Sequence, residues 1–177
     1  ADYTAPLPQP ERFEVYPNRD SLPFIAEYRF DPGWTIRDFT RGTLRLNGWS
    51  EAWADVFATL ESDPDADELK TLSDDLWSRY PLGKDEADRV VLCVALKAER
   101  AGQSVWHKTW VLDAAGDIRG SAMARLVSGT VSLAAEAVMD REIPVGVHAA
   151  PHDPRIVKRW LEWVRGQVQH MRLVDHR

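Results

Sequence analysis

Two β-rich runs separated by a short loop decide the fold: "RVVLCVALKAER" at residues 89–100 and "SVWHKTWVLDA" at 104–114. Both runs are rich in β-branched and aromatic residues, and the connecting "AGQ" contains the glycine typical of a hairpin loop. Large side chains occupy both alternating faces of these runs. We therefore predict a β-hairpin that is apolar on both faces, of which one layer of helices can cover only one.

Helical patterns flank this hairpin on both sides. In some of these segments apolar residues recur at spacings of three and four, which predicts an amphipathic helix. In the segment 121–143 small and apolar residues lie on several faces, which predicts a helix buried on more than one side. In the last of these segments Asp153 is a capping residue and Pro154 takes the first helical position. The predicted helices lie at 49–60, in the acidic stretch that follows Pro64, at 121–143 and at 153–171.

The remaining strand signal precedes the first helix. Apolar and polar residues alternate over about 36–46, and the period slips near Gly42, which suggests a bulge or a close backbone approach. The first ten residues contain three prolines and are expected to be extended. Since the elements do not alternate regularly between strand and helix, we predict an α+β fold over residues 1–177, a single domain with a mixed β-sheet and helices packed on one face.

Composition narrows the classes of function. The chain has 177 residues, 44% hydrophobic and 28% charged, and its net charge of -6 disfavours nucleic acid and anionic membranes as partners. The single cysteine, Cys93, lies in an apolar run, so we expect a buried thiol and a reducing compartment. No run of about 18 apolar residues and no signal-peptide pattern occurs, which favours a cytoplasmic location.

Two polar stretches have the same character, "YPNRDSLPF" at 16–24 and "TRGTLRLNGW" at 40–49, and we predict that they belong to one site or one joint. In the first, Asn18 and Asp20 can bond their own backbone in Asx turns, so a structural brace and a ligand contact both remain open. His148 and His152 have no third ligand nearby, and we expect no metal site.

These stretches, followed by "SAMARLVSGTVSLAAEAVMDREIPVGVHAAP" at 121–151, resemble the carboxy-terminal domain of the saccharopine dehydrogenase family, especially the saccharopine reductase type of lysine metabolism. The resemblance extends from about 13 to 151. It implies a fold like the C-terminal domains of saccharopine reductase and glyceraldehyde-3-phosphate dehydrogenase, which would bind an amino-acid-derived substrate and form a homodimer. It also implies an amino-terminal Rossmann domain that binds NAD or NADP.

The chain itself contains no G-x-G-x-x-G motif after a strand. We therefore expect no cofactor-binding residue here, and we interpret the opening "ADYTAPLPQPE" as a link from a Rossmann domain that this sequence does not include.

The resemblance also suggests which residues bind substrate. Arg41 matches the family's "RGTLRY" motif at a position that resembles a substrate-carboxylate ligand, and Gly42 would allow close backbone approach. Alternatively, Arg41 pairs with a neighbouring aspartate and is structural. Leu46 replaces the motif's aromatic residue, which leaves the substrate open. The complete set of substrate-binding candidates is Asn18, Arg19, Arg41, Gly42, Thr43 and Arg45.

Three functions therefore stay open. The chain is the substrate-binding half of a nicotinamide-dependent oxidoreductase that acts on the C–N bond of an amino-acid secondary amine or imine. Alternatively, it is a dimerisation module with structural arginines, or a free-standing domain that binds a small molecule. A Rossmann half encoded in frame upstream of Ala1 would favour the first function.

Overall fold

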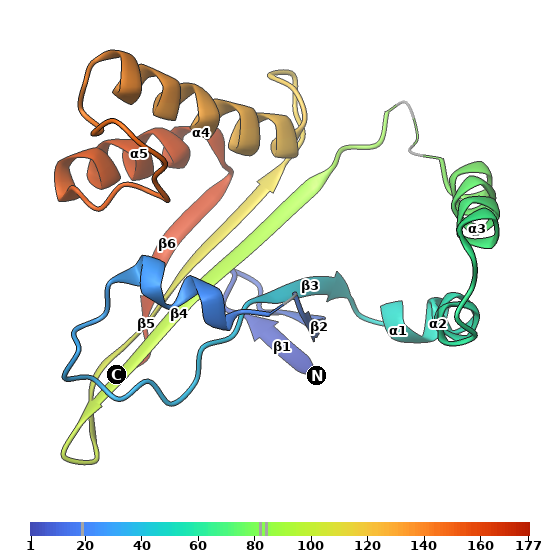
Figure 1. The fold of residues 1–177 in the computed structure, drawn as a ribbon, viewed down its shortest axis with the longest axis horizontal. Coiled ribbons are helices and arrows are strands. Elements are labelled where there is room, and N and C mark those ends of the chain that lie inside the picture. The colour runs from blue at the N-terminus through green and yellow to red at the C-terminus, as the bar shows by residue number, and fades with distance from the viewer. Residues whose placement is uncertain (19, 82, 84) are drawn as a thin grey trace.

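The computed structural model describes residues 1–18, 20–81, 83 and 85–177 (Figure 1). It confirms the α+β class. The strands are β1 (Asp2–Ala5), β2 (Glu11–Pro17), β3 (Gly42–Leu46), β4 (Arg89–Arg100), β5 (Gln103–Ala115) and β6 (His170–Asp175). The helices are η1 (Leu22–Phe24), η2 (Ala26–Tyr28), α1 (Trp49–Ala52), α2 (Ala54–Glu61), α3 (Ala66–Arg79), α4 (Ala122–Met139) and α5 (Pro154–Gln167).

The strands form two three-stranded sheets, in the orders β1-β2-β3 and β4-β5-β6, and every described pairing within them is antiparallel. This arrangement replaces the single mixed sheet that we expected. The extra strands are β1 and β2 from the proline-rich beginning of the chain, and β6 from its end. In β2, Phe13 and Val15 alternate with polar residues, so the sequence does contain a strand signal there, close to the prolines that favour an extended segment.

The central hairpin is confirmed. Its loop is tighter than the predicted "AGQ", because Arg100 pairs with Gln103 across a two-residue turn. Ala101 and Gly102 in that turn both have positive φ, at 50° and 76°, as a type I′ hairpin turn requires. The final predicted helix ends at Gln167, not at 171, because the chain then turns back to pair β6 with β5.

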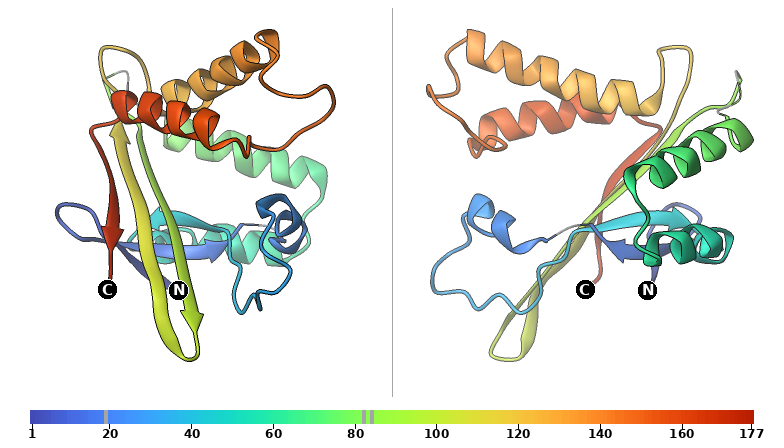
Figure 2. Two further views of the ribbon diagram at one scale, coloured as in Figure 1. Left: turned by 90° about the vertical axis from the view of Figure 1, so that its left-hand side faces the viewer. Right: turned by 45° about the vertical axis from the view of Figure 1, so that its right-hand side comes forward.

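Alternate residues of β5 serve two different cores. Val111 is fully buried between the two sheets, where it joins a cluster with Ala5, Leu7 and Phe13. Leu112 points the other way, into a cluster beneath the helices. Figures 1 and 2 show α4 and α5 over one end of the β4-β5-β6 sheet, while the β1-β2-β3 sheet crosses its opposite face.

The segment before the first α-helix differs from the prediction. Only 42–46 of the expected strand 36–46 pairs with a neighbour. Phe39 instead joins an aromatic cluster within its own loop, with ring centroids 5.4 Å from Tyr28 and 6.3 Å from Phe30. The predicted helix 49–60 is divided at Trp53 into α1 and α2.

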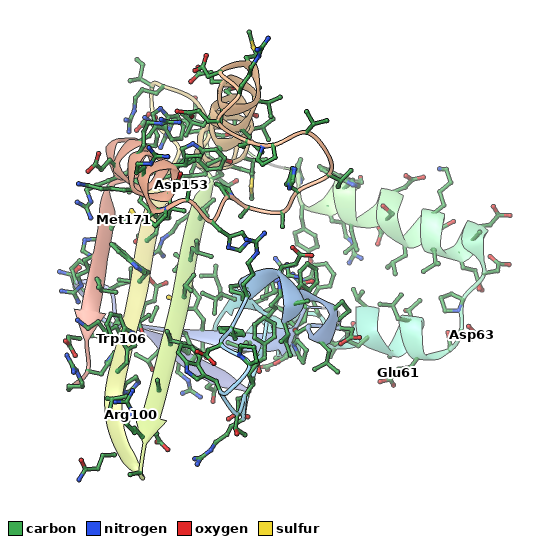
Figure 3. The ribbon with its side chains drawn as sticks, turned by 60° about the vertical axis from the view of Figure 1, so that its left-hand side comes forward. Glu61, Asp63, Arg100, Trp106, Asp153 and Met171 are labelled. Carbon is green, nitrogen blue, oxygen red and sulfur yellow. The ribbon has the colours of Figure 1, made fainter. Side chains whose placement is uncertain are left out.

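The segment 47–87, which we call the helical arm, leaves the body of the molecule. It contains α1, α2 and α3, and none of its described residues is buried. In Figure 3, Glu61 and Asp63 mark the turn between α2 and α3 at the far end of the arm. The helix α3 is stabilised locally by the Asp65 capping box, in which the side chains of Asp65 and Glu68 each accept from the other's backbone N–H.

The accessible surface is large for the length of the chain. It measures 13634 Å², whereas a compact monomer of this mass exposes about 8,700 Å². Two features account for part of the excess: the helical arm, and the open half of the β4-β5-β6 sheet. The helix α4 also has the length and apolar composition of a membrane span, with a mean hydropathy of 1.2, although it carries a buried, hydrogen-bonded arginine, Arg125.

Candidate functional site

The two polar stretches of the sequence meet where β2 and β3 end. The strands pair in regular register, with Tyr16 opposite Thr43 and Pro17 opposite Gly42. Beyond the strand ends, the Asn18 backbone N–H donates to the Arg41 carbonyl at 2.9 Å, and the Arg41 N–H donates to Ser21 Oγ at 3.0 Å. The prediction that these stretches form one joint is confirmed.

The side chain of Arg41 lies against the aromatic ring of Phe24. Its guanidinium carbon lies 3.9 Å from the centroid of the Phe24 ring, well within the range of a cation–π contact. Within the described part of the chain, no carboxylate lies within salt-bridge distance of Arg41. The structure thus does not contain the Arg41–aspartate pair that would have made this residue structural.

Arg45 occupies a second aromatic platform. Tyr16 and Trp49 stack with ring centroids 5.1 Å apart and planes 15° from parallel. The Arg45 guanidinium lies 5.5 Å from the Trp49 ring, and its Nη2 donates to the Tyr16 hydroxyl at 3.3 Å. This hydrogen bond lowers the pKa of Tyr16. Arg45 therefore faces the same side of β3 as Thr43, as regular pairing requires.

The carboxylate opposite Arg45 is already occupied. Glu14 accepts hydrogen bonds from the backbone N–H groups of Gly48 and Ser50, the latter at 2.8 Å, where the chain enters α1. The bonds from Ser50 and Gly48 lower the pKa of Glu14. Glu14 therefore fixes the turn that presents Trp49 and forms no salt bridge with Arg45.

Gly42 lies in close contact with the neighbouring strand, which agrees with the close approach expected as the alternative to a bulge. A Cβ atom at this position would lie 2.8 Å from Val15 Cγ1, so the missing side chain makes room for the neighbouring strand. The pairing shows no bulge at Gly42. Asp20 forms the predicted Asx turn, in which its Oδ1 accepts from the Leu22 N–H at 3.0 Å. Asn18 is exposed, and Arg19 lies outside the described residues.

The sequence of this chain matches the family model for the saccharopine dehydrogenase C-terminal domain over residues 2–169. The chain belongs to this family. No curated protein and no solved structure matches it.

The other candidate groups of this saccharopine dehydrogenase C-terminal domain do not form a reactive site. Burial raises the pKa of the Cys93 thiol, and burial together with the hydrogen bond to Cys93 raises the pKa of Tyr3 to about 12. Both groups are therefore protonated at neutral pH, and the thiol lacks nucleophilic character. The described ranges contain no group of three or more histidine, cysteine or acidic side chains positioned to hold a metal ion.

A second arginine site in this family member was not recognised in the sequence. The Arg125 side chain is almost fully buried at the start of α4. Its Nη1 donates to Asp117 Oδ1 at 2.9 Å and to the Gly120 carbonyl at 2.6 Å, and its Nη2 donates to the Ala115 carbonyl at 2.9 Å. Most of its donors are satisfied by protein acceptors, so it joins the end of β5 to α4.

The described residues do not fit a dinucleotide. A nicotinamide cofactor binds where parallel strands are joined by helices, with a glycine-rich turn opening the first helix. Here all described strand pairings are antiparallel, and Gly120, the glycine just before α4, has its backbone tied to Asp117 and to Arg125. We assign no chemistry to a cofactor at these residues.

Proposed function

We propose that this domain is the substrate-binding and dimerisation half of an NAD(P)-dependent oxidoreductase of the saccharopine dehydrogenase type. The reaction would be at the C–N bond of an amino-acid secondary amine or imine. The observation that carries the proposal is the pair of guanidinium groups, Arg41 and Arg45, each held on aromatic rings with no carboxylate partner in the described chain. Family membership supports it.

The proposal has a chemical basis in how guanidinium groups bind anions. A guanidinium presents its N–H donors in the plane of the group and can bind a carboxylate through two parallel hydrogen bonds. The Phe24 ring has no oxygen or nitrogen that could accept a hydrogen bond, so the donors of Arg41 stay available. A substrate with several carboxylates, such as an amino acid joined to a keto acid through nitrogen, suits two such receptors.

A Rossmann domain of the same protein would hold NAD(P), which would supply the hydride acceptor for oxidation at the C–N bond. Loss of a hydride and a proton would convert the secondary amine to an imine, and hydrolysis of the imine would give an amino acid and a carbonyl compound. This domain would hold the carboxylates so that the C–H bond faces the nicotinamide. We place the enzyme in cytoplasmic amino-acid metabolism, with lysine metabolism as the first candidate.

Calorimetry on the 177-residue chain tests whether this domain binds the substrate and not the cofactor. We expect saccharopine to bind and NAD(P) not to bind at micromolar concentration, since no phosphate-binding turn is available. Replacing both arginines, Arg41→Gln with Arg45→Gln, should abolish saccharopine binding without lowering the melting temperature. Micromolar binding of NAD(P), or saccharopine binding unchanged in the double variant, would contradict the proposal.

A separate observation supports the dimerisation role. The face of the β4-β5-β6 sheet that lies beyond α4 and α5 carries a row of exposed apolar side chains, which we call the open sheet face. Cross-strand pairing places them together. They are Leu92, Val94, Leu96, Trp106 and Leu173, each between 41% and 53% exposed.

We propose that a second copy of this chain covers the open sheet face. The exposed surface exceeds that of a compact monomer by about 4,900 Å², and a stable interface needs only about 800 Å² from each partner. The excess is therefore sufficient for a dimer contact and for a Rossmann domain as well. The charged side chains on this face, Lys108 and Asp175, pair with each other at 3.1 Å, so the face can pack against its own copy around a twofold axis.

Sedimentation at tens of micromolar tests this contact, and we expect a dimer. Val94→Glu should give a monomer, because two carboxylates would be buried at the interface. Val147→Glu adds the same charge at a fully exposed loop position and should leave the dimer intact. A wild-type monomer at these concentrations would remove the dimerisation role and leave the substrate-binding role unaffected.

A further inference from the structure

The contact between Arg41 and Phe24 joins two parts of the chain that are 17 positions apart. Phe24 ends the short helix η1, and Arg41 immediately precedes β3. The guanidinium carbon lies 3.9 Å from the ring centroid, which is the distance of direct stacking. The two residues come from the two polar stretches of the sequence, 16–24 and 40–49.

The loop that carries Phe24 is fixed to Arg41 at its backbone too. The Arg41 N–H donates to Ser21 Oγ, and the Arg41 carbonyl accepts from the Asn18 N–H. Asp20 Oδ1 accepts from the Leu22 N–H and so sets the first residue of η1. Asn18, Ser21 and Phe24 therefore hold Arg41 by its carbonyl, its N–H and its side chain.

Packing does not explain why an aromatic residue stands at position 24. Phe24 is 40% exposed and belongs to neither of the two buried clusters. In the described chain it stacks on no other ring, unlike Tyr28 and Phe30, which stack on each other in the same loop. Its one specific aromatic contact there is with Arg41.

We propose that Phe24 is a positioning residue for Arg41, which it orients for a ligand carboxylate. This inference rests on the proposed function. An aspartate at position 24 would orient the guanidinium as well, but it would occupy the donor edge and compete with the ligand. The phenyl ring restricts the rotamers of Arg41, and because it has no oxygen or nitrogen acceptor it leaves the N–H donors and the positive charge available. Binding then costs less side-chain entropy.

The test is an NMR titration of the 177-residue chain with saccharopine, with L-glutamate as a second probe. Phe24→Leu keeps an apolar side chain but removes the ring. We expect a Kd for saccharopine about two- to fivefold higher, which is the size of an exposed cation–π contact. Phe24→Tyr keeps the ring and should restore the wild-type Kd. The ring-current shift of the Arg41 side-chain resonances should disappear in Phe24→Leu and persist in Phe24→Tyr.

Two further variants separate the possible failures. Tyr28→Leu removes an aromatic residue from the same loop that does not contact Arg41, and it should leave the Kd unchanged. Phe24→Leu should have no further effect when Arg41→Gln is already present, because Phe24 acts through Arg41. If Arg41→Gln weakens binding while Phe24→Leu does not, the positioning role is wrong and the proposed function stands. If Arg41→Gln leaves binding unchanged, the role of Arg41 in the proposed function fails first.

Discussion

The corner around Arg125 and the β2–β3 edge around Arg41 each hold a guanidinium, and they satisfy it in different ways. Arg125 is buried and donates to Asp117 and to backbone carbonyls. Arg41 stacks on Phe24 and forms no salt bridge within the described chain. An arginine whose donors are bonded to the protein stabilises the fold, whereas one held only by its face remains available to an anion. Sequence alone does not distinguish the two.

Removal of Arg125 should have the largest effect on stability. Arg125→Met fills a similar volume but removes one of the two donors to each of the Ala115 and Gly120 carbonyls, the donor to the Gln167 carbonyl, and one of the two arginine partners of Asp117. We expect the unfolding free energy to fall by about 1.5 to 3 kcal/mol, which is the usual contribution of hydrogen bonds to a charged group. Urea denaturation monitored by circular dichroism measures it.

Arg155→Met is the matched control for this prediction. Arg155 also pairs with an aspartate, Asp153, at 2.8 Å, but its side chain is 91% exposed. Exposed pairs contribute little to stability, so the midpoint should hardly move. Equal destabilisation by the two variants would show that burial does not determine which arginine stabilises the fold, and it would contradict the structural role given to Arg125.

Arg41→Lys should have the opposite profile, with a large effect on activity and none on stability. In the complete enzyme we expect kcat/KM to fall by about 30- to 150-fold, since lysine keeps the charge and loses a bidentate pair of about 2 to 3 kcal/mol. Steady-state kinetics with saccharopine measures this change. Arg37→Lys is the control, because Arg37 already pairs with Glu99 at 3.1 Å and should tolerate the exchange. Unchanged kinetics for Arg41→Lys at equal stability would make Arg41 structural.

Local signals in the sequence predicted the elements whose structure depends on nearby residues. The β4-β5 hairpin and the start of α5, at Asp153, follow from alternation, turn residues and a cap, and α3 begins after Pro64 as expected, although its capping box at Asp65 was not recognised in the sequence. The strand β6 could not be predicted this way, because the apolar spacing of α5 continues to Val168. Its separation from the helix depends on pairing with β5, a tertiary contact.

In the candidate site, too, the sequence predicted what depends on local residues and missed what depends on tertiary contacts. The sequence indicated that residues 16–24 and 40–49 belong together, since both are dense in polar and turn-forming residues. It did not indicate that Phe24 lies against Arg41, because that contact depends on the path of the loop between them. It also gave no reason to select Arg125 over the other arginines, since its acceptors are mostly backbone carbonyls of distant residues.

The packing that supports the Arg125 corner can be tested without touching an arginine. A Cβ atom on Gly129 of α4 would overlap the Trp163 ring of α5, so Gly129→Ala must displace the ring. Overpacking costs about 1 to 3 kcal/mol, and the better helix propensity of alanine offsets up to about 1 kcal/mol of this. We therefore expect a net loss of about 1 to 2 kcal/mol in urea denaturation, with unchanged saccharopine binding at the Arg41 edge.

Gly166→Ala provides the control for the same exchange. Gly166 lies in α5 with no atom within 4 Å of its Cβ position, so alanine should stabilise the protein by up to about 1 kcal/mol. If both variants are stabilising, α4 and α5 do not pack as closely as the structure has them. Weaker saccharopine binding by Gly129→Ala would show that the two regions are coupled.

The smallest effect is expected from pH, and it should appear at one region only. Hydrogen bonds from the side chain and the backbone N–H of Arg119, with smaller contributions from the charges of Arg119 and Arg125, lower the pKa of Asp117 from 3.8 to about 2. A carboxyl group with a lowered folded-state pKa stabilises the fold above its unfolded value, and this contribution is lost as pH falls through the folded value. Asp117→Asn should therefore lower the melting temperature at pH 7, and the difference from wild type should shrink between about pH 4 and pH 2.

The Arg41 edge should not respond to acid in this range, because no carboxylate of the described chain pairs with the Arg41 guanidinium and its aromatic partner, Phe24, carries no charge. The ring-current shift of the Arg41 side chain should persist as long as the domain stays folded. Asp38→Asn, at a position with no hydrogen bond or salt bridge from its side chain in the described structure, is the control and should follow the wild-type pH profile. If Asp117→Asn lowers the melting temperature equally at pH 7 and at about pH 2, the charge of Asp117 contributes nothing. Its role would then be steric, and Arg125 would be held by the backbone carbonyls alone.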